Sequence, residues 1–180
     1  FDIDEGPRPS TSVEKLATLK PAFKKDGLMT AGTASQISDG AAAILIGNKS
    51  KSDALGVAPR AKFRAMSVSG VDPTIMLTGV IPATEMVLKK AGMQMSDIDL
   101  FELNEAFASV PLAWAKDMKA DMDKVNVNGG AIALGHPLGC SGARLLVTLL
   151  HEMERRDVQT GLATLCIGFG MAVATVIERV

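Results

Sequence analysis

Short apolar runs alternate with amphipathic stretches through most of this 180-residue chain, and the alternation limits the folds that it can adopt. Strand-like and helix-like segments that take turns along a sequence predict helices layered on a sheet whose strands run mainly parallel. The last two apolar runs are separated only by Gly-Phe-Gly and predict an antiparallel hairpin. We therefore expect an α/β layered domain with a mixed, mainly parallel sheet flanked by helices. The expected strands are 41–46, 61–68, 98–103, 125–127, 162–166 and 171–178.

Helix signals are clearest in the second half of the chain. Residues 82–92 begin with proline and end with two lysines and a glycine, which is the polarity that a helix favours. Residues 141–156 carry an aliphatic stripe at helical spacing. We also expect short helices at 11–19 and 50–55, and a helix from Asn104 onward that Pro111 kinks.

Composition excludes several classes of function. The net charge is −1 without a basic block, so binding to nucleic acid or to an anionic membrane is not expected. No apolar run reaches the ~20 residues that span a bilayer. Cys140 and Cys166 fit neither a disulfide framework nor a zinc spacing, which predicts reduced thiols, no metal site and a cytoplasmic location. The chain starts without methionine in a loop-like stretch, and we expect it to be a piece of a longer protein.

Residues 126–144 contain five glycines, a proline and one of the two histidines. Glycine allows left-handed backbone and close approach of a ligand, so this stretch is a candidate binding loop. His136 lies between Gly135 and Pro137 and is a candidate acid or base, whereas His151 lies within a predicted helix and is interpreted as structural. A phosphate-binding interpretation is weak, because the glycines match neither nucleotide-binding fingerprint.

Asn104 and Cys166 each follow or end a predicted strand. Functional groups gather beyond strand ends in sheets of this class, so we expect both residues at one edge with His136. Cys166 alone is most simply a small buried hydrophobe, but Gly168 and Gly170 after it allow backbone N–H groups to form an oxyanion site. Asn104 is equally well explained as a helix cap, and Cys140 is interpreted as a packing residue.

Three motifs, taken together, resemble a known family. Asn104-Glu-Ala-Phe, Asn126-Val-Asn-Gly-Gly-Ala-Ile-Ala-Leu-Gly-His-Pro-Leu-Gly and Cys166-Ile-Gly-Phe-Gly occur in the order found in the carboxy-terminal half of thiolases, the acetyl-CoA acetyltransferase and 3-ketoacyl-CoA thiolase family. The resemblance runs through essentially the whole chain. It implies that residues 1–38 are the tail of a CoA-binding loop region and that residues 39–180 form the carboxy-terminal catalytic domain.

The resemblance implies a two-step acyl transfer in fatty acid metabolism, such as the β-oxidation step that cleaves a 3-ketoacyl-CoA, or the reverse Claisen condensation. A nucleophilic cysteine takes the acyl group from one acyl-CoA and passes it to a second thiol or thioester. By resemblance, His136 activates that cysteine and helps to stabilise an oxyanion, and Asn104 fixes a water in the same hole. Cys166 exchanges a proton with the Cα of acetyl-CoA, and the Gly168 N–H helps to form a second oxyanion hole.

The resemblance also implies contacts with CoA and acyl-CoA, which act as substrates and not as permanently bound cofactors. Two residues resemble contacts to the nucleotide end of CoA, two resemble residues of the pantetheine channel, and two resemble residues that line the acyl pocket. In that order they are Arg8 and Phe23, Ser35 and Ile37, and Met76 and Phe107.

The chain departs from the family in one major respect. The family's nucleophile lies in its amino-terminal half, and neither Cys140 nor Cys166 stands in the nucleophile's motif. We therefore expect the isolated chain to be inactive, with an amino-terminal thiolase half and further copies, as a homodimer or homotetramer, as its partners. Thr33, Gln36 and Phe169 differ from common family residues, which leaves acyl chain length and reaction direction open.

Two alternatives remain at this level. One is a non-catalytic thiolase-like module that binds acyl-CoA or serves as an assembly surface. The other is a redox or metal-binding protein that uses Cys140, Cys166 and His136, although no ligand spacing supports it.

Overall fold

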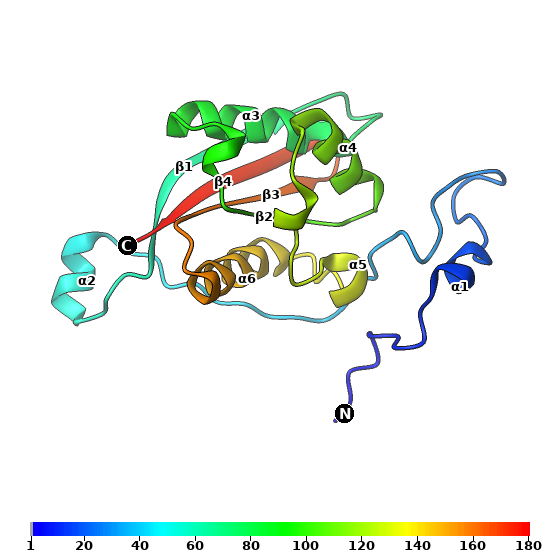
Figure 1. The fold of residues 1–180 in the computed structure, drawn as a ribbon, viewed down its shortest axis with the longest axis horizontal. Helices are drawn as coiled ribbons and strands as arrows, with labels where there is room; N and C mark the ends of the chain where they lie inside the picture. Colours follow the sequence, from blue (N-terminus) through cyan, green and yellow to red (C-terminus); the bar gives the residue numbers. More distant parts are fainter. Residues whose placement is uncertain (1) are drawn as a thin grey trace.

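A four-stranded sheet lies at the centre of the computed structural model, which describes residues 2–180 (Figure 1). The strands are β1 (Ala61–Gly70), β2 (Leu100–Leu103), β3 (Thr160–Ile167) and β4 (Met171–Arg179), in the spatial order β1-β4-β3-β2. The α-helices are α1 (Val13–Ala17), α2 (Lys49–Leu55), α3 (Val80–Ala91), α4 (Ser109–Met118), α5 (Ala131–Leu134) and α6 (Ser141–Arg156). Single 3-10 turns occur at η1 (Leu77–Gly79), η2 (Met95–Asp97) and η3 (Met122–Lys124).

The sheet is mixed, as predicted, but it is not mainly parallel. β2 and β3 pair in parallel, whereas β4 is antiparallel to both β3 and β1. β1, β2 and β3 therefore run in the same direction, and the returning strand of the hairpin lies between β1 and β3 instead of at an edge. The predicted hairpin is confirmed, and its position is the reason that two of the three pairings are antiparallel.

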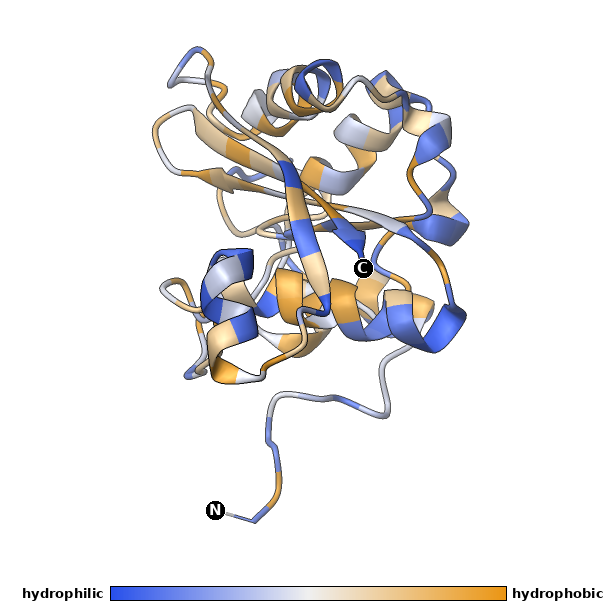
Figure 2. Ribbon diagram, turned by 90° about the vertical axis from the view of Figure 1, so that its left-hand side faces the viewer, coloured by the Kyte–Doolittle hydropathy of each residue, from blue (hydrophilic) through white to orange (hydrophobic). Residues whose placement is uncertain are grey.

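Helices cover both faces of this sheet (Figure 1). α3 and α4 pack on one face around a cluster that includes Val87, Trp114 and Leu162. α6 packs on the other face, where Leu149 and Ala163 belong to a second cluster. Neighbouring residues of β3 enter different clusters because side chains alternate along a strand. The side view in Figure 2 shows the resulting order of helix, sheet and helix.

The two helices with the strongest sequence signals are confirmed. α3 ends at Gly92, which has a φ of 68° in the left-handed conformation that commonly terminates helices. Lys89 and Lys90 occupy its last turn, where cations are favoured by the helix dipole. α6 spans 141–156 as predicted and buries its aliphatic stripe.

Three predicted elements are wrong. Residues 41–46 form no strand, because no neighbouring strand within residues 2–180 pairs with them, and Leu45 remains 81% exposed. The helix expected from Asn104 begins only at Ser109, which puts Pro111 in the first turn, where its missing N–H does no harm and no kink is needed. The strand expected at 125–127 is reduced to one parallel bridge between Val125 and Phe101.

The amino-terminal part of the chain packs differently from the rest. α1 and α2 contain no buried residues, and residues 2–30 lead away from the layered body in Figure 1. α2 ends at Gly56 as predicted, whereas α1 is shorter than the expected 11–19 and is capped by the Ser12 hydroxyl, which accepts from the Lys15 N–H. None of the helices described for residues 2–180 has the length and hydropathy to cross a bilayer.

Candidate active site at the carboxyl ends of β2 and β3

The parallel pairing of β2 and β3 brings their carboxyl ends to one edge of the sheet. Asn104 directly follows β2, and its backbone N–H donates to the Thr164 carbonyl at 3.0 Å. Cys166 lies two residues further along β3. Because α4 starts at Ser109 with Ala108 as its N-cap, the interpretation of Asn104 as a helix cap is wrong. Its side chain therefore caps no helix and is available for contacts at the edge of the sheet.

His136 reaches this edge from the loop between α5 and α6. Its backbone N–H donates to the Gln36 carbonyl at 2.8 Å, and its ring Nε2 lies 3.2 Å from Asn104 Nδ2. Gly135 before it has a φ of 90°, and a Cβ at that position would overlap the Ser38 hydroxyl. Glycine is therefore needed both for the backbone conformation and for the close approach of the 36–38 segment.

Both ring nitrogens of His136 have partners. Nδ1 lies 2.6 Å from the Ser141 hydroxyl, which also donates to the Pro137 carbonyl at 3.1 Å. Burial, and secondarily the positive charge of Arg144, lowers the pKa of His136 below its ordinary value of 6.5. The imidazole is thus neutral near pH 7 and held in one orientation, which suits a general base.

Asn104 carries an unused acceptor. The residue is fully buried, and its Oδ1 atom has no hydrogen-bond partner within residues 2–180. A buried polar atom left unpaired typically costs about 1–3 kcal/mol. A water or ligand donor would relieve this cost, so the amide oxygen marks a place for one beside the imidazole.

Sequence reasoning missed two residues that support this corner. The Asn126 side chain accepts from the Leu103 N–H and donates to the Leu103 carbonyl, each at 2.8 Å, so it extends the sheet edge as a peptide group would. It also donates to Glu105 Oε1 at 2.8 Å, and Glu105 Oε2 accepts from the Ile132 N–H at 3.2 Å. A Cβ on Gly130 would overlap the Glu105 carboxylate, which explains that glycine. Nothing local in the sequence predicts these long-range contacts.

A buried ion pair lies beneath the site. Arg144 Nη1 is 3.3 Å from Glu102 Oε2, and the Glu102 side chain is almost fully buried on the α6 face of β2. Burial raises the pKa of Glu102 to about 7, although the nearby guanidinium opposes the shift. Arg144 thereby links the start of α6 to β2 and contributes positive charge near His136.

Cys166 is half-buried on the α3 side of the sheet and is paired across the hairpin with Ala172. Burial raises the pKa of the Cys166 thiol, which is therefore protonated at neutral pH. Gly168 is exposed, and nothing lies within 4 Å of where its Cβ would stand. Within residues 2–180, no hydrogen bond joins Cys166 to Asn104 or His136, so the three groups share an edge without forming one bonded cluster.

The candidate ligand-contacting residues lie in two groups. Phe23 is 73% exposed and packs edge-to-face on Phe107, with ring centroids 5.7 Å apart. Ser35 is bound to the segment after Asn104, because its hydroxyl and its N–H both donate to the Ala106 carbonyl. Phe23 and Ser35 thus both contact the segment that follows Asn104. In the prediction, Phe23 contacts the nucleotide of CoA, Ser35 the pantetheine arm and Phe107 the acyl chain.

The remaining three candidates are less tightly held. Arg8, on the exposed amino-terminal segment, donates to Gln36 Oε1 at 3.5 Å. Ile37, which follows Gln36 in the sequence, is 84% exposed. Met76 is half-buried at the start of η1 and has a φ of 61°. A positive φ is uncommon for methionine and fixes the backbone there in a strained conformation.

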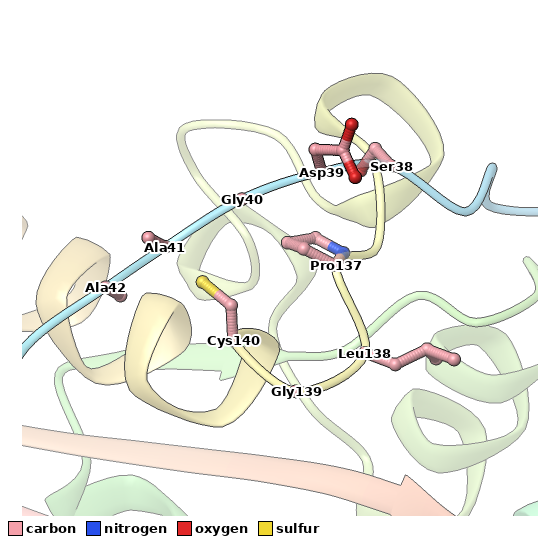
Figure 3. A pocket seen from close by; sticks show the side chains of 9 residues that line it. All are labelled: Ser38, Asp39, Gly40, Ala41, Ala42, Pro137, Leu138, Gly139 and Cys140. Atoms are coloured by element: carbon pink, nitrogen blue, oxygen red, sulfur yellow. The ribbon is translucent and has the colours of Figure 1, made fainter.

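Residues 38–42 form a strap across the loop that carries His136 (Figure 3). A Cβ on Gly40 would overlap the Pro137 ring, so the strap lies directly on the loop. A pocket of about 350 Å³ between them is lined by residues 38–42 and 137–140, and Cys140 points toward the strap. Asn104, His136 and Cys166 do not line this pocket. Residues 2–180 contain no cluster of three or more His, Cys, Asp or Glu that fits a metal ion.

Two family models match the chain. The thiolase C-terminal domain matches residues 57–179, and the thiolase N-terminal domain matches residues 1–50. The first match alone covers more than half of the chain. The chain belongs to the thiolase family. The resemblance inferred from the three motifs is confirmed.

Curated relatives agree with this assignment. The chain is 58% identical over 184 residues to the 3-ketoacyl-CoA thiolase of Escherichia coli O9:H4 (strain HS), and it covers 48% of that protein. It is 57% identical over 183 residues to the 3-ketoacyl-CoA thiolase of Yersinia pestis (strain Pestoides F), of which it covers 47%. These alignments include 100% and 99% of this chain, respectively. The chain thus spans about half the length of these relatives.

Solved structures confirm the fold. The Bacillus anthracis acetyl-CoA acetyltransferase matches with a TM-score of 0.95 and 48% identity, over 98% of this chain and 45% of that one. Human mitochondrial 3-ketoacyl-CoA thiolase in complex with CoA matches with a TM-score of 0.92 and 42% identity, over 100% and 46%. The layered α/β architecture, with its mixed sheet and flanking helices, is therefore that of thiolases.

Proposed function

We propose that this chain supplies the carboxy-terminal half of a thiolase active site and that the complete enzyme cleaves 3-ketoacyl-CoA with CoA. The observation that carries the proposal is the contact between His136 and Asn104, with an unused Asn104 oxygen, at the sheet edge where Cys166 lies one residue before the end of β3. The names of the 57–58% identical relatives support the thiolytic direction over acetoacetyl-CoA synthesis.

In this proposal His136 accepts the proton of a nucleophilic cysteine that the amino-terminal half provides. The thiolate attacks the 3-keto carbon, whose oxygen becomes an alkoxide. A water held by Asn104 Oδ1, together with the protonated His136 Nε2, stabilises the enolate oxygen of the thioester that departs when the bond to Cα breaks. One such donor is typically worth about 3 kcal/mol. The attacked carbon then loses its bond to Cα, and the second thiol, of CoA, takes the acyl group from the enzyme.

Cys166 is the proton donor to the departing Cα carbanion. Its raised pKa supports this role, because the group must carry a proton before the carbon–carbon bond breaks. The open space at Gly168 leaves its backbone accessible to the alkoxide oxygen that forms at the attacked 3-keto carbon. Cys166 then recovers its proton when the thiol of CoA enters.

Binding of CoA involves the amino-terminal segment in this proposal. Residues 1–38 form the tail of the CoA-binding loop region, with Arg8 and Phe23 toward the nucleotide and Ser35 and Ile37 along the pantetheine arm. The exposure of Phe23 and Ile37 supports this arrangement, since both are free to cover a ligand. The proposal also includes a cytoplasmic location and a homodimeric or homotetrameric assembly.

A chimaeric enzyme tests the proposal. It joins the part of the Escherichia coli relative that precedes the matched region to this chain, and thiolysis of acetoacetyl-CoA is followed by loss of the substrate's absorbance. We expect turnover by the chimaera and none by the chain alone. A folded chimaera that binds CoA without turnover would instead support a non-catalytic acyl-CoA-binding module, and turnover by the chain alone would refute the shared site.

A further inference from the structure

The His136 ring lies in a line of four groups that can be oriented only in certain ways. Asn104 Nδ2 is 3.2 Å from Nε2, Nδ1 is 2.6 Å from the Ser141 hydroxyl, and that hydroxyl is 3.1 Å from the Pro137 carbonyl. A neutral imidazole has one N–H and one bare nitrogen, so only one of its two contacts is donated by the ring. The two end groups, the Asn104 amide and the Pro137 carbonyl, decide which of the two contacts the ring donates.

In the side-chain orientations of this structure, each end group presents one hydrogen-bonding character to the line. The Pro137 carbonyl can only accept, and the Asn104 amide nitrogen can only donate. If the single Ser141 proton goes to the carbonyl, the hydroxyl oxygen accepts from Nδ1–H, and bare Nε2 accepts from Asn104. Each contact along the line then pairs one donor with one acceptor. The opposite arrangement sets the N–H of Nε2 against the N–H of Asn104, with two donors facing each other.

We propose that Ser141 is a positioning residue that holds His136 in the tautomer with its proton on Nδ1 and a bare Nε2. Ser141 is the first residue of α6 and is only 1% exposed. Its backbone N–H donates to the same Pro137 carbonyl at 2.9 Å, so the helix start fixes the residue at two points. In the proposed tautomer the hydroxyl donates its proton to that carbonyl and presents its oxygen to Nδ1.

This inference rests on the proposed function, because only a base that receives a proton at Nε2 needs that nitrogen without a proton. The thiol proton then takes the lone pair that accepts from Asn104 Nδ2 when no thiol is bound. With the other tautomer, the ring would present N–H toward the incoming thiol and could not accept its proton there. The wrong histidine tautomer in a serine protease lowers kcat about 10⁴-fold, which sets an upper bound for the effect here. A hydroxyl is a weaker hydrogen-bond partner than the carboxylate that orients the protease histidine. We therefore expect kcat to fall roughly ten- to a hundredfold when the hydroxyl is removed.

Nitrogen-15 NMR of the chimaeric enzyme, labelled at histidine, tests the assignment directly. The His136 signals are identified by their loss in a His136→Asn variant. We expect a protonated, pyrrole-type signal for Nδ1 and a bare, pyridine-type signal for Nε2 at neutral pH. Protonation at Nε2 in the unsubstituted enzyme would overturn the proposal. This readout needs no turnover, so a failed activity assay would refute the proposed function without deciding the tautomer.

Two serine substitutions separate positioning from folding. Ser141→Ala removes the partner of Nδ1, and we expect the Nε2–H tautomer to appear and kcat to fall roughly ten- to a hundredfold, with KM little changed. Ser67→Ala is the matched control, because Ser67 is also buried and donates to a backbone carbonyl, that of Ala83, at 2.6 Å on β1. It should leave both His136 signals and kcat unchanged. An unchanged tautomer in folded Ser141→Ala would contradict the proposal.

Discussion

The two parts of this chain differ in how much apolar surface they bury within the described residues. Residues 61–179 bury two apolar clusters on opposite faces of one sheet, with side chains such as Leu149 and Trp114 at 1% exposure or less. Residues 2–57 contain two short helices with no buried residue and leave Leu45 81% exposed. The candidate catalytic groups lie in the first part, and most candidate CoA contacts lie in the second. We infer that the rigid part performs the chemistry and the exposed part shapes ligand binding.

The largest expected effect follows from this division. In the chimaeric enzyme, His136→Asn or Cys166→Ser removes a group that moves a proton, and kcat should fall about 10²–10⁴-fold. Ile37→Ala, on the exposed segment, should change KM by a few-fold and leave kcat nearly unchanged. Steady-state kinetics with acetoacetyl-CoA distinguish the two outcomes. A larger kcat loss for Ile37→Ala than for Cys166→Ser would mean that the exposed segment, and not the layered part, carries the chemistry.

Two leucine truncations compare the parts energetically. In the 180-residue chain, Leu149→Ala should cost about 3 kcal/mol of unfolding free energy, because it leaves a cavity between α6 and the sheet. Leu45→Ala should stay within about 0.5 kcal/mol, as expected of an exposed residue. Urea unfolding measures both. We infer that the added half packs on Leu45, so in the chimaera the cost at Leu45 should rise. Equal costs in both proteins would contradict that packing.

A glycine supports the catalytic corner by leaving room for a carboxylate. Gly130→Ala places a methyl group where the Glu105 carboxylate lies, and we expect a loss of about 1–3 kcal/mol in stability with reduced kcat. Glu105→Ala in the same protein should recover part of the stability, since it removes the overlap. Thermal unfolding of the single and double variants checks this. Additive losses in the double variant would show that the two residues do not compete for space.

The pH dependence of the chimaera reports the surroundings of His136. Activity requires the neutral ring, and the pKa of His136 is lowered by burial and by Arg144, so the acid limb of kcat/KM should lie below pH 6.5. Arg144→Gln should move that limb to higher pH, because removing a positive charge favours the protonated ring. Arg144→Lys keeps the charge and is the control. A limb that moves to lower pH in Arg144→Gln would contradict the assignment.

The smallest expected change in unfolding free energy concerns an ion pair at the surface. Arg60, just before β1, donates to both carboxylate oxygens of Glu154 on α6, and both side chains are about one-third to one-half exposed. Exposed pairs contribute about 0.2–1 kcal/mol, so Arg60→Ala should cost no more than that. Urea unfolding at low and high salt checks it. A cost of several kcal/mol would mean that this surface pair contributes as much as a buried contact.

The sequence predicted those elements whose signals are local. The aliphatic stripe of α6, the Gly92 end of α3 and the Gly-Phe-Gly hairpin all depend on residues within a few positions of one another. Residues 104–108 resist helix formation because Ala108 N–H donates to the Thr33 carbonyl, a contact with a remote segment. Residues 41–46 have strand composition but no neighbour to pair with in the described chain. Local patterns do not contain this information.

The candidate site shows the same limit. His136, Asn104 and Cys166 were singled out by motif and by position after strands, and the structure brings the first two into contact. The sequence predicts Ser141 only as the start of a helix and Asn126 only as part of a short strand that leads into the glycine loop. The roles of these residues depend on the orientation of a ring and on an open sheet edge. Supporting residues of this kind become visible only once the fold places their partners.

In the proposed function, this chain provides the base, the oxyanion groups and the proton donor, while the nucleophile comes from the other half. Mass spectrometry of the chimaera after rapid mixing with acetyl-CoA tests it most directly, by locating the acetyl group on a peptide. We predict that the acetyl group lies on a cysteine of the amino-terminal half and that Cys140 and Cys166 remain unmodified. An acetyl group on Cys166 or Cys140 that forms and disappears at the rate of turnover would contradict the account.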